Sequence, residues 1–155
     1  MTQPVVVGSV LYGADYEVAQ FVWQRIRHLR DHPFPFENAT ALGVVRTIGG
    51  EPRLIGGIVF NNSRRFDIEM HGAFDVPDWC RPSTLRRLFT YPFVQLGVTR
   101  MTTITGRKNK AARRIDEFVG FKLEGTVRKG LDGREDAMIY GMLKSECKFL
   151  PKETN

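Results

Sequence analysis

One stretch of the chain gathers cations at the start of a predicted helix. Within residues 106–121, five basic residues precede the first acid, Asp116. They are Arg107, Lys108, Lys110, Arg113 and Arg114. Asn109 is a favourable N-cap, and a helix N-terminus attracts anions through its free amides and its dipole. The pattern indicates either an anion site or the solvated basic side of an amphipathic helix.

Two potential proton acceptors lie on a predicted strand, Arg65–Phe74. Its alternation gives an apolar face and a polar face, and Glu69 and His71 fall together on the polar one. Histidine has an ordinary pKa near 6.5, which suits a general base, whereas Glu69 would act through a water molecule. Alternatively, both side chains face solvent or pair with Arg64 or Arg65.

Several common catalytic signatures are absent from the sequence. It contains no GxxxxGK[ST] phosphate loop, no HExxH zinc motif, no GxSxG elbow and no GxGxxG after a strand. His28, His32 and His71 are widely scattered, and Cys80 and Cys147 show no paired spacing. We therefore predict neither a metal site nor a disulfide framework, and the NTPase, metalloprotease and hydrolase classes lose their main support.

The elements that must position these residues alternate along the chain. Helical periodicity predicts three helices: Asp15 to about Arg30, Leu85–Leu96 with a kink at Pro92, and Asn109–Val119. The buried face of the third is expected to be Ala111, Ala112, Ile115, Phe118 and Val119. Alternation and turn residues predict seven strands: Val5–Tyr12, Ala39–Ile48, Arg53–Phe60, Arg65–Phe74, Arg100–Thr105, Glu124–Arg128 and Ala137–Leu143. A helical crossover permits Arg65–Phe74 and Arg100–Thr105 to run parallel.

Length and composition are those of one globular domain, residues 1–155, with 42% hydrophobic and 26% charged residues. No apolar run approaches the roughly 18 residues that span a bilayer. The N-terminus has no secretory pattern, so we expect a cytoplasmic protein. Charge is uneven: residues 1–80 carry 7 Lys and Arg against 9 Asp and Glu, whereas residues 81–155 carry 16 against 8. The basic half indicates an anionic partner or a solvated basic face.

The spacing of several motifs resembles that of the GNAT superfamily of N-acetyltransferases. Asn109, Ala112 and the pair Gly120-Phe121 are similar to its Asn-x-x-Ala…Gly-Phe motif. Two later segments resemble the closing strands of that family: Glu124–Arg128, and Asp136 followed by Tyr140–Met142. Trp79–Thr84 lies where the family has its pyrophosphate loop. The resemblance covers residues 65–149, and the N-terminal third agrees in element order.

The resemblance implies a fold, a co-substrate and a site. The fold is α/β (α+β), with a mixed, mostly antiparallel sheet of about seven strands and helices on both faces. Acetyl-CoA is the implied co-substrate, with its pantetheine arm between strands Arg65–Phe74 and Arg100–Thr105, which should diverge. The implied contacts are Gly72, Arg81, Ser83, Thr84, Asn109, Lys110 and Arg113. An amine of unknown identity is the implied acceptor, with Glu69 or His71 as base and no metal.

Two positions depart from the family pattern. The segment Cys80–Thr84 has no glycine, and Pro82 has no amide to donate to a phosphate. Asp116 stands where many members have a tyrosine acid, and we expect it to stay ionised as a partner of Arg113. A second hypothesis is therefore a catalytically inactive GNAT-like module whose basic half binds nucleic acid or an acidic protein. Phe34 and Phe36 would either wall the acceptor site or pack in the core.

Overall fold

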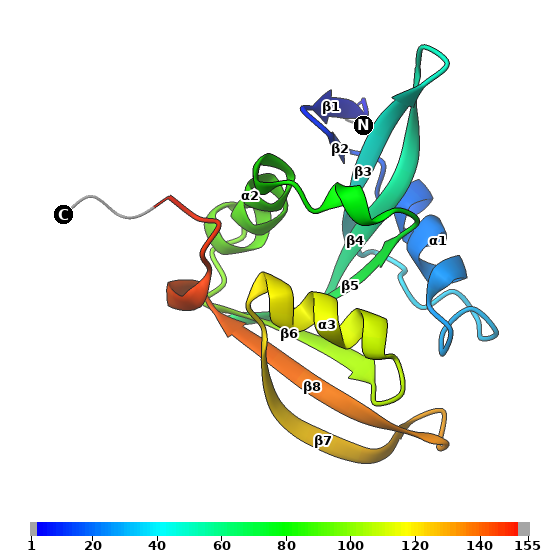
Figure 1. Cartoon of the computed structure of the whole chain (residues 1–155), viewed down its shortest axis with the longest axis vertical. Helices are drawn as coiled ribbons and strands as arrows, with labels where there is room; N and C mark the ends of the chain where they lie inside the picture. Colours follow the sequence, from blue (N-terminus) through cyan, green and yellow to red (C-terminus); the bar gives the residue numbers. More distant parts are fainter. Residues whose placement is uncertain (1–2, 152–155) are drawn as a thin grey trace.

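One mixed sheet runs through the part of the chain that the computed structural model describes, residues 3–151. Within it, eight strands follow the order β1-β2-β3-β4-β5-β6-β8-β7 (Figure 1). The strands are β1 (Val5–Val7), β2 (Val10–Tyr12), β3 (Thr40–Ile48), β4 (Glu51–Arg64), β5 (Asp67–Phe74), β6 (Arg100–Gly106), β7 (Lys122–Leu131) and β8 (Glu135–Leu143). The helices are α1 (Asp15–Arg25), α2 (Pro82–Thr90) and α3 (Lys110–Val119), with short turns η1 (Pro77–Trp79), η2 (Tyr91–Gln95) and η3 (Lys144–Glu146). Neighbouring strands are antiparallel except β5 and β6, so the predicted fold class is confirmed.

The first predicted strand is in fact a hairpin, which raises the strand number from seven to eight. Gly8 has a φ of 61°, a left-handed conformation that reverses the chain between Val7 and Val10. The valines in this segment favour a strand, so the sequence predicts one continuous strand over Val5–Tyr12. Its alternation does not reveal that a glycine in its middle acts as a turn residue.

Helix α1 ends at Arg25, whereas the sequence predicts an end near Arg30. Ile26 is extended, with φ −91° and ψ 112°, and the chain then forms turns in which Trp23 Nε1 donates to the Leu29 carbonyl at 2.9 Å. Asp15 does not cap the helix, because its carboxylate accepts the Ala41 amide at 2.9 Å. The apolar residues after Arg25 therefore belong to an ordered loop beside the sheet.

Strands β5 and β6 are adjacent and parallel, as predicted, and they separate after a short paired stretch. Their register contains three pairs, from Asp67↔Arg100 to Glu69↔Thr102. The crossover between them is α2, which widens into the π-helical turn η2 where Pro92 removes an amide. The disruption of the helix predicted at Pro92 is present as a change from α-helix to π-helix.

Helices cover both faces of the sheet, as predicted. On one face, α1 packs on β3, β4 and β5 through Val18 and Val22, next to Val59 of β4. On the other face, α2 and α3 lie over β5, β6 and β8 (Figure 1), where Phe89 and Tyr140 belong to the larger core. No helix within residues 3–151 has the length and apolarity needed to cross a membrane.

Helix α3 is rotated relative to the prediction. Ile115 and Phe118, expected in the core, are 39% and 62% exposed, whereas Asp116 is only 8% exposed. Val119 is buried as predicted. The rotation follows from polar contacts beneath the helix: Thr105 donates to Asp116 at 2.7 Å, and Arg113 donates to the Tyr140 hydroxyl at 2.9 Å. Apolar periodicity alone carries no information about these two contacts.

Candidate active site

A cleft of about 530 Å³ opens where β5 and β6 separate. Its walls are Met70–Phe74 of β5, Thr103–Gly106 of β6, Leu85 and Phe89 of α2, and side chains along the whole length of α3. Residues 24–28 and Arg30, at and after the end of α1, form its far rim. Because α1 lies on the opposite face of the sheet from α2 and α3, the cleft reaches through the sheet (Figure 1).

The two strands present unpaired edges to this cleft. β5 pairs with β4 up to Phe74, and β6 pairs with β8 up to Gly106, but they pair with each other only as far as Glu69 and Thr102. Among residues 3–151, no strand pairs with the facing edges beyond that point. Backbone amides and carbonyls on such an edge seek hydrogen-bond partners. An extended ligand that contains amide groups can pair there as an added strand would.

Of the two predicted bases, only His71 lines the cleft. Its Nε2 lies 2.9 Å from Asn61 Oδ1, so that nitrogen donates and Nδ1 keeps its lone pair. The imidazole also packs against the Phe36 ring, with centroids 5.1 Å apart. Burial, and to a smaller extent the nearby His28, lower the pKa of His71 to about 4. His71 is therefore a neutral imidazole at physiological pH.

Glu69 lies behind His71, not beside it in the cleft. It is 9% exposed, contrary to the solvent-facing position that was one of our alternatives. Asn62 Nδ2 donates to one of its carboxylate oxygens at 2.9 Å, and that oxygen lies 3.8 Å from His71 Nε2. The predicted pairing with Arg64 is present at 3.8 Å. Glu69 thus supports the polar face of β5 that carries His71.

Asp116 also lines the cleft, and its environment differs from the one predicted from the sequence. The expected partner, Arg113, instead contacts the Tyr140 hydroxyl and the Arg107 carbonyl. Burial raises the pKa of Asp116 to about 6, although the hydrogen bond from Thr105 opposes this shift. The carboxyl is therefore partly protonated near neutral pH, which a surface pair with arginine would have prevented.

The remaining predicted contacts divide between the cleft and its surroundings. Gly72 and Asn109 line it, and Asn109 Oδ1 also caps α3 by accepting the Ala112 amide at 3.2 Å. Lys110 is exposed at the first turn of α3, next to the cleft. Arg113 is turned toward Tyr140, below the helix.

The predicted residues near the start of α2 lie around a different hollow. Arg81 and Thr84 line a second cavity of about 230 Å³ on the β3 side of the loop. Thr84 is 3% exposed, so its hydroxyl is directed into the protein, whereas Arg81 and Ser83 are exposed. Pro82 is the first residue of the helix, and its position leaves the next amides as the donors of this N-terminus.

An aromatic stack that the sequence did not reveal closes one end of the cleft. Phe74 and Trp79 lie face to face with centroids 3.5 Å apart, and both line the cleft. The glycine opposite makes this possible, because a Cβ on Gly56 would lie 2.1 Å from Phe74 Cδ1. A phenylalanine followed five positions later by a tryptophan is too common a pattern to predict such a contact.

Ion pairs fix the opposite rim. Arg25 binds Asp75 through two hydrogen bonds of 2.7 and 3.1 Å, which joins the end of α1 to the end of β5. Glu135 at the start of β8 accepts the Lys108 amide at 2.5 Å and contacts Arg27 at 3.1 Å. These contacts hold four separate segments around the cleft mouth on the α1 side: the end of α1, the end of β5, the β6–α3 turn and the start of β8.

Phe34 and Phe36 serve the core and not the cleft lining. Phe36 is 3% exposed. Phe34 packs edge to face against Trp23 and Phe36, at 5.6 and 6.0 Å between centroids. Of the two alternatives, core packing is the one the structure shows.

The chain has the fold of the GNAT superfamily. A GNAT-family acetyltransferase from Bacillus anthracis superposes with a TM-score of 0.64 and 17% identity, covering 93% of this chain and 100% of that one. A ribosomal-protein-S5-alanine acetyltransferase from Vibrio fischeri gives 0.65 and 15%, covering 95% and 100%. A spermidine N-acetyltransferase chimera that includes the Vibrio cholerae enzyme gives 0.65 and 15%, covering 88% and 96%. No protein-family model and no curated protein sequence matches the chain.

Proposed function

We propose that this protein is an N-acetyltransferase that passes an acetyl group from acetyl-CoA directly to an amine. The observation that carries the proposal is the cleft between β5 and β6, whose unpaired strand edges suit a pantetheine arm. Because the cleft passes through the sheet, the thioester enters from the α2 and α3 face. The amine then approaches from the α1 face. Direct transfer needs this convergence of two substrates on one carbonyl carbon.

The proposed coenzyme contacts follow from placement. Gly72 and Asn109 are assigned to the pantetheine arm, because both line the cleft. Arg81, Ser83 and Thr84, at the start of α2, are assigned to the pyrophosphate. The donors are the Arg81 guanidinium, the exposed Ser83 hydroxyl and the free amides of the helix N-terminus. These amides partly compensate for the missing loop glycines.

Two further proposed contacts belong to α3. Lys110 is assigned to a phosphate, since its ammonium group is exposed near the cleft. Arg113 acts indirectly, because its bond to the Tyr140 hydroxyl fixes the position of the helix. Tyr140 in turn contacts Glu117 at 3.3 Å, which adds a second tie between β8 and α3.

His71 is the proposed proton acceptor. A neutral amine attacks the thioester carbonyl, a C–N bond forms, and the nitrogen becomes positively charged and strongly acidic. His71, neutral because burial lowers its pKa to about 4, has Nδ1 free to take that proton. Glu69 and Asn61 act as positioning residues that fix the ring. A group with so low a pKa accepts the proton of this adduct but does not deprotonate a free ammonium ion.

Asp116 is the proposed proton donor to the departing thiolate. The C–S bond breaks as the carbonyl re-forms, and the sulfur gains an electron pair that a nearby acid can protonate. With a pKa of about 6, roughly a tenth of the Asp116 carboxyl is protonated at pH 7. This revises the expectation that Asp116 stays ionised, and the reason is its burial against Thr105.

Two neighbouring alanines of α3 provide a matched test by calorimetry with acetyl-CoA. Ala112 lines the cleft, whereas Ala111 is exposed on the same turn. We expect Ala112→Phe to fill the cleft and weaken binding at least about tenfold, and Ala111→Phe to change it less than about twofold. Equal thermal stability of the two variants serves as the folding control. Equal affinities would place the coenzyme elsewhere.

A further inference from the structure

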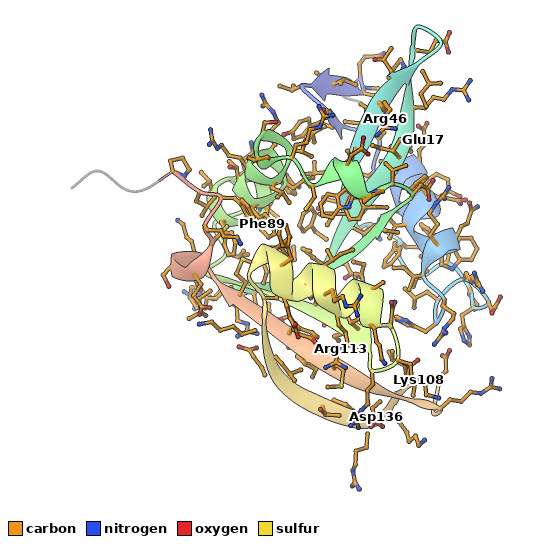
Figure 2. All side chains as sticks on the ribbon, viewed as in Figure 1. Glu17, Arg46, Phe89, Lys108, Arg113 and Asp136 are labelled. Atoms are coloured by element: carbon orange, nitrogen blue, oxygen red, sulfur yellow. The ribbon has the colours of Figure 1, made fainter. Side chains whose placement is uncertain are left out.

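A basic rim extends from the cleft mouth on the α1 side, where Arg27 and Arg30 line the cleft, to the β7–β8 hairpin. We use this name for six residues from three segments: Arg27, Arg30, Arg107, Lys108, Lys129 and Arg134. All six are exposed. Figure 2 shows Lys108 at this end of the molecule, next to Asp136 on the β7–β8 hairpin.

Hydrogen bonds and an ion pair hold the rim together. The Arg107 amide donates to the Asp136 carbonyl at 3.0 Å, which joins the β6–α3 turn to the hairpin. Lys129 Nζ donates to the Arg134 carbonyl at 3.1 Å across that hairpin. Arg27 reaches Glu135 from the loop after α1. The cations are therefore brought together by the fold and are not merely close in sequence.

The acids inside the rim are already committed to donors. Glu135 and Asp136 are 15% and 21% exposed, and each accepts a backbone amide as well as an arginine. The Lys129 amide and the Arg107 guanidinium hold the pKa of Asp136 below its usual value, so it stays ionised and engaged. Asp132 pairs with His32 at 3.0 Å. Six cations against these three carboxylates and the exposed Asp31 leave a net positive surface beside the cleft mouth.

The chemistry of the amine selects the class of partner. An aliphatic amine attacks a thioester more readily than a nucleobase does, since the exocyclic amines of nucleobases are delocalised and weakly nucleophilic. Single-stranded nucleic acid also favours stacking on aromatic side chains. The exposed aromatic residues of the described chain are Tyr16, Phe66 and Phe118, and none belongs to the rim. An acidic polypeptide fits both the charge and the reaction.

We propose that the basic rim binds acidic residues of a peptide or protein whose amine enters the cleft as the acyl acceptor. The inference rests on the proposed acetyltransferase function and names the class of its acceptor. Arg27 and Arg30 lie beside the entrance, so acidic residues close to the amine meet them first. Attraction at this surface raises the encounter rate and orients the amine toward His71.

Fluorescence anisotropy tests the rim with two labelled peptides that share one free amine. One carries aspartates beside the amine, and the other carries serines. We expect the wild type to bind the aspartate peptide at least about tenfold more tightly at low salt, and this preference to shrink at high salt. The double variant Arg27→Glu/Arg30→Glu, which reverses the two cations beside the entrance, should remove the preference. The control Arg53→Glu/Arg65→Glu, which changes the charge equally at exposed sites outside the rim, should keep it.

Three results would overturn the inference. They are equal binding of both peptides, equal effects of the rim and control variants, and displacement of the aspartate peptide by a single-stranded RNA of equal charge. Acetyl-CoA calorimetry on the same samples separates the two proposals. If the wild type binds acetyl-CoA but shows no peptide preference, only the proposal for the rim is refuted. If the wild type does not bind acetyl-CoA, the acetyltransferase function itself is refuted.

Discussion

Asp116 and His71 are buried titratable groups whose pKa values move in opposite directions. Burial raises that of Asp116 to about 6 and lowers that of His71 to about 4. The folded state thus binds a proton at Asp116 more readily than the unfolded state does, and at His71 less readily. Each shift of roughly 2 pKa units corresponds to about 3 kcal/mol of stability. In the wild type the two effects offset each other between pH 4 and about 6.5.

Asp116→Asn should remove one of these two opposing pH effects on stability and so make the other measurable. The stability associated with Asp116 is complete below pH 3.8 and is lost as pH rises through 6, because ionisation then opposes folding. Relative to the wild type, the variant should therefore gain up to about 3 kcal/mol as pH rises from 4 to 7. Urea unfolding across this range measures the difference. A difference independent of pH would show that Asp116 titrates normally.

His71→Gln should show the opposite slope. The stability associated with His71 is complete above pH 6.5 and is lost as pH falls through about 4, because the buried ring must then be charged. Relative to the wild type, this variant should lose stability as pH rises over that interval. The same urea series measures it. If the unfolding free energies of the variant and the wild type depend on pH in the same way, the His71 ring is not buried in the neutral form.

Catalysis gives a second test of His71 at the same scale. Removal of a well-placed base typically costs about 10²–10⁴-fold in rate, so His71→Gln should lower kcat/KM to that extent once an amine acceptor is in hand. Acetyl-CoA affinity should remain within about twofold, because the base contacts the amine and not the coenzyme. Glu69→Gln, one layer behind, should have a smaller effect. A larger loss in Glu69→Gln than in His71→Gln would reverse the assignment.

At the scale of elements, Gly56 of β4 gives the most specific prediction. Its missing side chain leaves room for Phe74, which stacks on Trp79. Gly56→Ala should displace that stack and destabilise the protein by about 1–3 kcal/mol. Gly125 has no neighbour within 4 Å of an added Cβ, so Gly125→Ala is the control. Tryptophan fluorescence and unfolding curves report both effects. Equal behaviour of the two variants would contradict the packing described here.

The elements also show which kinds of information the sequence contains. The sequence of helices and strands along the chain follows from periodicity, glycines and prolines, which are local signals. The helical crossover that lets β5 and β6 run parallel follows from the same signals. The hairpin at Gly8 and the rotation of α3 depend on which of two local options the rest of the fold favours. The resemblance pointed to the right pair of strands, but it did not indicate that Arg113 binds Tyr140. Side-chain partners distant in sequence leave no periodic trace.

At the scale of the whole molecule, the two halves of the chain supply opposite sides of the cleft and carry different charge. The basic half, residues 81–155, supplies α3 and the β7–β8 hairpin, which form one side of the cleft and most of the basic rim. The N-terminal half supplies α1, the loop after it and β5, including His71. The two halves meet along the short parallel pairing of β5 and β6. The proposed reaction takes place where these halves separate.

Hydrogen–deuterium exchange with and without acetyl-CoA tests whether the coenzyme lies between β5 and β6. If the coenzyme pairs with the unpaired strand edges, amides in Met70–Phe74 and Thr103–Gly106 should exchange more slowly when it is bound. The β3–β4 hairpin around Gly49, away from the cleft, should exchange at the same rate in both samples. Protection confined to the second cavity at Arg81 and Thr84, or no protection at saturating acetyl-CoA, would contradict the account.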